Sequence, residues 1–175
     1  IEQAGIKLGD TVVVQGSGPV GLNSAILAQL AGAVNVIVVG GPAHRLELAK
    51  QFGVDAVVNI EDTTAEERVA AIKAMTAGRG ADVVIEATGF PAAVKEGMAM
   101  ARDAGTYVVV GQYTNNGDIS MNPHLDINKK HLTIKGTWGI DLSHFYRSIQ
   151  IMAKHHNRFA WENFISGHYG LHEVN

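Results

Sequence analysis

The chain has no cysteine among its 175 residues, which excludes disulfides and thiolate metal sites within it. Charged residues make up only 18% and the net charge is −3, so we expect no nucleic-acid-binding surface. No apolar run approaches the roughly 20 residues that cross a membrane. The lack of cysteine fits a reducing compartment, and we expect a cytoplasmic protein with no membrane partner.

The ends of the chain also lack familiar signals. Residues 1–5 have neither the basic start nor the apolar middle of a secretory signal peptide. The chain begins without Met, and we expect it to be a fragment of a longer protein. Hydrophobic residues make up 46% of it, and 175 residues are enough for one well-cored domain.

The most informative motif is Gly-Ser-Gly-Pro-Val-Gly at residues 16–21. An apolar, β-branched run at residues 10–15 precedes it, and apolar residues at helical spacing follow it. A strand, a G-x-G-x-x-G turn and a helix in this order form the dinucleotide-binding fingerprint. Gly16 permits the tight turn, Gly18 lets the backbone approach a pyrophosphate, and Gly21 lets the helix pack closely on the strand. The motif therefore predicts a dinucleotide site.

Strand and helix patterns alternate along most of the chain. Further strands are predicted at residues 34–39, 55–59, 81–87, 105–111 and 132–136, and helices at residues 43–52, 64–77, from Pro91 onward and at 142–155. Near-continuous Val/Ile runs in this order predict an α/β fold with a doubly wound, mostly parallel six-stranded sheet. Its ligand is expected at the carboxyl ends of the strands, where the strand order reverses. The alternation stops near Ala160.

Four segments resemble the medium-chain, zinc-type alcohol dehydrogenase family. They are Gly9–Val14 running into the glycine motif, Arg45–Lys50, Gly78–Gly89 and Gly105–Gly111. The resemblance extends from about Gly5 to His155. It implies a Rossmann-fold NAD(P)-binding domain at residues 1–160 and a tail at residues 161–175 that returns toward a catalytic domain.

In this family the catalytic domain lies mostly N-terminal to such a segment and holds the catalytic zinc. The resemblance therefore implies an oxidoreductase that transfers hydride between a secondary alcohol or polyol and NAD(P). It also implies that this fragment holds no catalytic residue and no metal, and is inactive alone. The eight histidines show no metal-site spacing, which agrees with that expectation.

The resemblance also assigns the cofactor contacts. Val20 is expected to press on the nicotinamide ring, residues 88–90 to line the adenosine half, and residues 110–111 and 137–138 to lie at the nicotinamide end. For Thr88 and Phe90 the alternative is ordinary helix capping and packing. The complete set of expected contacts is Gly16, Gly18, Pro19, Val20, Gly21, Gly40, Gly41, His44, Arg45, Thr88, Gly89, Phe90, Val110, Gly111, Thr137 and Trp138.

Gly40 is the position at which this sequence departs from NAD-preferring members. Those members place a carboxylate there, about twenty residues after the glycines, to bind the ribose hydroxyls. Gly40 removes the repulsion of a 2′-phosphate, and His44 and Arg45 are available as nearby positive charges. The alternative for Arg45 is an ordinary solvated helix residue. We expect NAD or NADP as cofactor, with NADP slightly favoured.

The sixth predicted strand carries apolar residues that would leave an unprotected edge in a monomer. They are Leu132, Ile134, Trp138 and Ile140. We therefore expect a homodimer or a tetramer built from dimers. Two alternative functions stay open from the sequence: a zinc-free NADPH reductase of the same superfamily, and a non-catalytic nucleotide-sensing module.

Overall fold

The computed structural model of the chain describes residues 1–139 and 141–173. The contacts divide the chain into two compact units, Ile1–Trp138 and Gly139–Asn175. The boundary near residue 160, expected from the sequence, stays a prediction. Ile140, which was expected to extend the apolar edge, and the last two residues of the expected tail lie outside the described residues.

The first unit contains one parallel sheet. Its strands are β1 Thr11–Gln15, β2 Asn35–Gly40, β3 Ala56–Asn59, β4 Ala81–Glu86, β5 Ala101–Val109 and β6 Thr133–Gly136. They lie in the order β3-β2-β1-β4-β5-β6, and every neighbouring pair is parallel. The predicted doubly wound sheet is therefore confirmed. Its strand order reverses between β1 and β4, where such sheets place their ligands.

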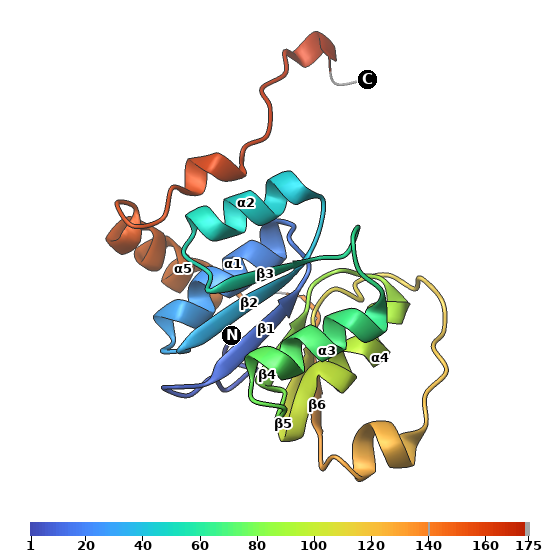
Figure 1. The fold of residues 1–175 in the computed structure, drawn as a ribbon. Coiled ribbons are helices and arrows are strands. Elements are labelled where there is room, and N and C mark those ends of the chain that lie inside the picture. Colours follow the sequence, from blue (N-terminus) through green and yellow to red (C-terminus); the bar gives the residue numbers. More distant parts are fainter. Residues whose placement is uncertain (140, 174–175) are drawn as a thin grey trace. The chain divides into compact units, whose positions relative to one another are not determined.

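Helices cover both faces of this sheet (Figure 1). They are α1 Pro19–Leu30, α2 Ala43–Gln51, α3 Ala65–Met75 and α4 Pro91–Met100. α3 and α4 pack on the face that carries Val13 and Ile37, while α1 and α2 lie over the opposite face. Because both faces are covered, the strands are apolar on both sides, as the Val/Ile runs predicted.

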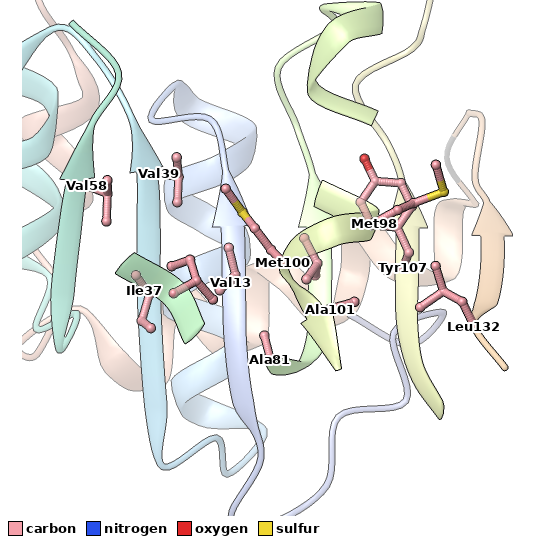
Figure 2. Packing of buried hydrophobic residues seen from close by; sticks show 12 residues of the cluster. Val13, Ile37, Val39, Val58, Ala81, Met98, Met100, Ala101, Tyr107 and Leu132 are labelled. Atoms are coloured by element: carbon pink, nitrogen blue, oxygen red, sulfur yellow. The ribbon is translucent and has the colours of Figure 1, made fainter. Parts of the chain in front are cut away.

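The core on the α3 and α4 side is a single cluster of buried side chains (Figure 2). β-branched residues from β1, β2 and β3 form one part of it, and Met98, Met100 and Tyr107 form the other. The labelled members are Val13, Ile37, Val39, Val58, Ala81, Met98, Met100, Ala101, Tyr107 and Leu132. This core holds the strands in register and so fixes where their carboxyl ends lie.

Most predicted element boundaries agree with the structure within two residues. The capping box before α3 is present: the Glu67 N–H donates to Thr64 Oγ1 over 3.2 Å, and the Thr64 N–H donates to Glu67 Oε2 over 2.8 Å. Pro91 is the first residue of α4, as predicted. β5 is the exception, because it starts four residues earlier than predicted. Its register with β4 shifts between Ala81 and Val83, and Ala104 has a φ of 54° there.

The second unit contains α5, Leu142–His155, which matches the prediction. The Ser143 N–H donates to the Asp141 carboxylate over 2.7 Å and so caps the helix start. After α5, the rings of Phe159 and Trp161 meet edge to face, with centroids 5.5 Å apart. Within residues 156–173, two short 3₁₀ turns follow, at Trp161–Phe164 and Leu171–Glu173. No helix within the described residues is both long and apolar enough to cross a membrane.

Candidate functional site

The loop between β1 and α1, together with the first turn of α1, has no room for a side chain at two glycine positions. Gly16 has a φ of +110°, and a Cβ there would lie 2.6 Å from the Ala87 carbonyl oxygen. A Cβ on Gly21 would lie 2.0 Å from the Gly16 carbonyl oxygen. Gly18 differs from both, because a Cβ there would meet nothing within 4 Å. Gly16 and Gly21 therefore shape the loop, while Gly18 leaves open space beside its backbone.

The start of α1 faces this open space without a side-chain cap. Gly18 is the N-cap residue, Pro19 follows it, and the first turn contains no acidic residue. The peptide N–H groups of a first helical turn lack intrahelical partners and carry a partial positive charge. An anion such as a pyrophosphate satisfies them. Val20 lies exposed on the same turn, so its isopropyl group is available to a bound molecule.

Ser17, which the sequence analysis did not single out, joins the glycine loop to the end of β2. Its side chain is only 3% exposed. Its Oγ donates to the Gly41 carbonyl over 2.8 Å and accepts from the Gly41 N–H over 3.1 Å. A Cβ on Gly40 would lie 2.6 Å from Ser17 Oγ and 2.9 Å from Ser17 N. The end of β2 therefore has no room for any side chain at Gly40, and His44 and Arg45 lie exposed just beyond it.

Glu86, at the end of β4, was also missed from the sequence. It is 0% exposed, and its Oε1 accepts from the Thr88 N–H, the Thr88 hydroxyl and the Gly89 N–H at 2.7, 2.7 and 2.9 Å. Its Oε2 accepts from the Gly111 N–H over 3.1 Å. The Thr88 hydroxyl also accepts from the Phe90 N–H over 3.1 Å, but Phe90 is the N-cap residue of α4 and no side chain caps that helix, so the helix capping considered as an alternative for Thr88 is not seen. The Phe90 ring is exposed, so packing is not its role in this unit.

The carboxyl ends of β5 and β6 complete this end of the sheet. The Val110 N–H donates to the Glu86 carbonyl, and the Thr137 N–H donates to the Val109 carbonyl, both over 3.0 Å. Trp138 is 74% exposed and stacks on Tyr113, with ring centroids 5.2 Å apart and planes 17° apart. The indole N–H donates to the Tyr113 carbonyl over 3.2 Å, which fixes the ring in this position.

The structure thus brings the predicted residues together at the carboxyl-terminal end of the sheet, because all six strands are parallel. Hydrogen bonds connect each pair of neighbouring strand ends. Ser17 connects β1 to β2, the Ala87 N–H donates to the Gln15 carbonyl of β1, Glu86 connects β4 to β5, and Thr137 connects β6 to β5. This end of the sheet offers uncapped amides and exposed apolar side chains, and the last residue of β2 is a glycine rather than an acidic residue. Those features suit an anionic molecule with a flat apolar part.

A cavity of about 550 Å³ lies elsewhere, at the opposite ends of β4 and β5. Its Lys130 ammonium donates to the carbonyls of Met98 and Ala101, both over 2.6 Å, and burial lowers the pKa of this lysine. These bonds satisfy the carbonyl end of α4, which is a structural role. Among the described residues, no three His, Asp or Glu side chains come together in a way that could hold a metal ion.

Comparison with known proteins gives a consistent result. The family described as zinc-binding dehydrogenase matches residues 19–154. The chain is 32% identical over 169 residues to the 5-exo-hydroxycamphor dehydrogenase of Pseudomonas putida, covering 97% of the chain and 46% of that protein.

Solved structures of the same family are also similar to this chain. An alcohol dehydrogenase of Thermotoga maritima superimposes with a TM-score of 0.83 and 38% identity, over 87% of this chain and 42% of that one. A zinc-binding dehydrogenase of Sinorhizobium meliloti bound to NADP gives a TM-score of 0.69 and 31% identity, over 78% and 39%. The chain spans less than half the length of each of these relatives. The resemblance noted in the sequence is therefore confirmed, and the chain belongs to the zinc-binding dehydrogenase family.

Proposed function

We propose that this chain is the dinucleotide-binding part of an NAD(P)-dependent alcohol dehydrogenase. The observation that carries the proposal is the loop of residues 16–21, where Gly16 and Gly21 admit no side chain, Gly18 adjoins open space and the start of α1 is uncapped. A loop of this kind fits a pyrophosphate, because its amides and the helix dipole both favour an anion.

In this proposal the chain positions the cofactor, and the cofactor supplies the hydride chemistry when it is bound. The amides of Gly18, Val20 and Gly21 hold the pyrophosphate, and Val20 provides apolar contact for the nicotinamide ring. Residues 88–90 line the adenosine half, and residues 110–111 and 137–138 lie at the nicotinamide end. Gly40 and Gly41 face the ribose of the adenosine half.

We place the catalytic zinc outside this chain. The sequence has no cysteine, and the described residues bring no three potential ligands together. The chain alone is then expected to bind cofactor without turning over substrate. A secondary alcohol is the substrate class we favour for the whole protein. The Pseudomonas relative, whose name gives a hydroxycamphor as substrate, supports this class.

NADP is the cofactor form that the end of β2 favours. Ser17 occupies the space beside Gly40, so no carboxylate can stand there to repel a 2′-phosphate. The first turn of α2 has no acidic residue and no side-chain cap, and it carries His44 and Arg45. A helix start with adjacent positive charge favours a phosphate. The NADP-bound relative from Sinorhizobium meliloti also supports this preference.

Calorimetry of the folded chain with NADP⁺ and NAD⁺ tests the proposal. Both are expected to bind, with NADP⁺ at least as tightly as NAD⁺. No heat from either ligand at millimolar concentration would overturn the proposed function. Tenfold tighter binding of NAD⁺ would overturn only the NADP preference.

Gly18→Ala gives the matched variant. Its Cβ meets nothing in the free protein, so stability should be unchanged, but it occupies the space proposed for the pyrophosphate. We expect roughly tenfold weaker dinucleotide binding, about 1.4 kcal/mol. Gly136→Ala, also with nothing within 4 Å, is the control for stability and should unfold at the same denaturant concentration as the wild type.

We further propose that the protein associates through β6. This strand pairs with β5 on one side and forms the outer edge of the sheet in the described chain. Ile134, in the middle of the strand, is 40% exposed. An edge strand with unpaired backbone groups and an apolar side chain is a surface on which a second copy can extend the sheet across a two-fold axis.

A further inference from the structure

Glu86 is a buried carboxylate to which the proposed function gives no task. Four hydrogen bonds reach its two oxygens, three on Oε1 and one on Oε2. Every one of these partners donates, which suits an ionised carboxylate. Within the described residues no Lys, Arg or His nitrogen lies within 4.0 Å of it, so its charge is balanced by N–H and O–H dipoles alone.

The donors to Glu86 come from two loops that are distant in sequence. Thr88 and Gly89 follow β4, while Gly111 follows β5, 25 residues beyond Glu86. The loops also touch directly, because a Cβ on Gly111 would lie 2.5 Å from Gly89 N and 2.6 Å from Glu86 Oε1. The carboxylate therefore connects the end of β4 to the end of β5 through hydrogen bonds.

The two oxygens of Glu86 serve different loops. Oε1 holds the β4 loop through three bonds, whereas Oε2 holds only Gly111. The Gly111 N–H is shared between Oε2 and the Glu86 carbonyl, which it reaches over 3.0 Å. A change that removes only the acceptor at Oε2 should loosen the end of β5 and leave the β4 loop in place.

We propose that Glu86 is a positioning residue that holds the end of β5 in place for the nicotinamide half of the dinucleotide. This inference rests on the proposed function, which assigns Val110 and Gly111 to that half. A buried polar network that is fully satisfied fixes one arrangement of its surroundings. Here the arrangement fixed is the distance between the β4 and β5 loops, across which a dinucleotide must extend.

Glu86→Gln separates this role from a purely structural one. The amide oxygen of Gln can take the three donors of Thr88 and Gly89, which leaves its NH₂ facing the Gly111 N–H, donor against donor. We expect NAD⁺ to bind roughly tenfold more weakly, while ADP-ribose, which lacks the nicotinamide, binds within about twofold of the wild type. Loss of folding stability alone would weaken both ligands equally.

Gln15→Met is the matched control. Gln15 is another buried polar residue, at the end of the adjacent strand β1, and its Nε2 donates to the Ala93 carbonyl of α4 over 2.9 Å. Its loss should lower stability without separating the two ligands. Equal weakening of both ligands by Glu86→Gln, or no weakening of either, would overturn the inference. Failure of the wild type to bind either ligand would instead overturn the proposed function, and this inference with it.

Hydrogen exchange of the wild-type chain gives a second measurement, which needs no variant to fold. The Gly111 amide should gain protection when NAD⁺ is added and should gain little with ADP-ribose. Protection of Gly111 that rises equally with both ligands would contradict the assignment of this amide to the nicotinamide half, and so overturn the inference.

Discussion

Placing a carboxylate at the end of β2 is a direct test of how the site is built. Gly40→Asp would restore the residue type of NAD-preferring dehydrogenases, yet the structure leaves no room for it. The new Cβ would lie 2.6 Å from Ser17 Oγ and 2.9 Å from both Ser17 Cβ and Ser17 N. Overpacking of this kind costs about 1–3 kcal/mol. Displacing Ser17 also breaks its bonds to Gly41, each worth about 1 kcal/mol net.

We therefore expect Gly40→Asp to lower the free energy of unfolding by about 3–5 kcal/mol, a large part of the 5–15 kcal/mol typical of a domain. Urea unfolding followed by circular dichroism measures this, and calorimetry measures NAD⁺ and NADP⁺ binding. Both cofactors should bind more weakly, because the glycine loop moves with Ser17.

Two further variants make the test specific. Gly136→Asp makes the same substitution at another strand end, where a Cβ meets nothing within 4 Å, and should cost far less stability. Ser17→Gly combined with Gly40→Asp removes the contacts to Oγ and Cβ but keeps the one to the backbone nitrogen, so it should recover part of the loss. A stable Gly40→Asp variant that binds NAD⁺ tenfold better than NADP⁺ would refute the reasoning.

Two other predictions concern parts of the chain outside the site. Asp82 accepts hydrogen bonds from the Thr11 N–H over 2.8 Å and from Arg102 Nε over 2.6 Å. Burial alone would raise the pKa of Asp82, but these donors outweigh it, so its pKa lies below the ordinary value. Its contribution to stability is then present above about pH 4 and is lost as the pH falls through the lower folded-state pKa. Asp82→Asn should cost about 1–3 kcal/mol at neutral pH. Urea unfolding of both proteins at pH 7 and pH 3 should show a smaller acid loss for the variant, and an equal loss would contradict this. For association, the wild type should sediment as a dimer or tetramer at micromolar concentration, and Ile134→Lys should shift it toward monomer. A wild-type monomer would rule out pairing through β6.

The glycine loop could be predicted because every feature that defines it is local. Residues 10–30 contain a β-branched strand, three glycines at fixed spacing and the apolar residues at helical spacing that begin the helix. The same holds for the capping box at Thr64, whose two partners are three residues apart. Short-range patterns of this kind depend on backbone geometry, which the neighbouring residues determine.

Ser17 and Glu86 could not be found in the same way, because each has one partner that is distant in the chain. Ser17 binds Gly41, 24 residues later, and Glu86 binds Gly111, 25 residues later. One signal for Glu86 was nevertheless present: it is a carboxylate that directly follows the apolar run Val-Val-Ile at the end of its strand. Such a group must be hydrogen-bonded when the strand is buried, which is a reason to look for donors on the neighbouring strand end.

The early start of β5 was missed for a different reason. Residues 102–104 are polar or small, and Asp103 and Ala104 are exposed, so they give no strand pattern. Ala104, with its φ of 54°, interrupts the regular extended backbone before the apolar part of the strand begins. Periodicity detects regular strands, and a locally irregular one escapes it.

The order of the strands has a consequence for how this protein folds. β1 to β3 are neighbours in sequence as well as in space, and so are β4 to β6. Among the described strands, only β1 and β4 pair across the two halves, and they lie about 70 residues apart along the chain. Such distant pairing is slow to form, because the intervening loop must be closed first. The glycine loop lies in one half and Glu86 in the other. The dinucleotide site is therefore complete only after β1 has paired with β4. Because a dinucleotide binds only this folded state, its binding would stabilise the association of the two halves.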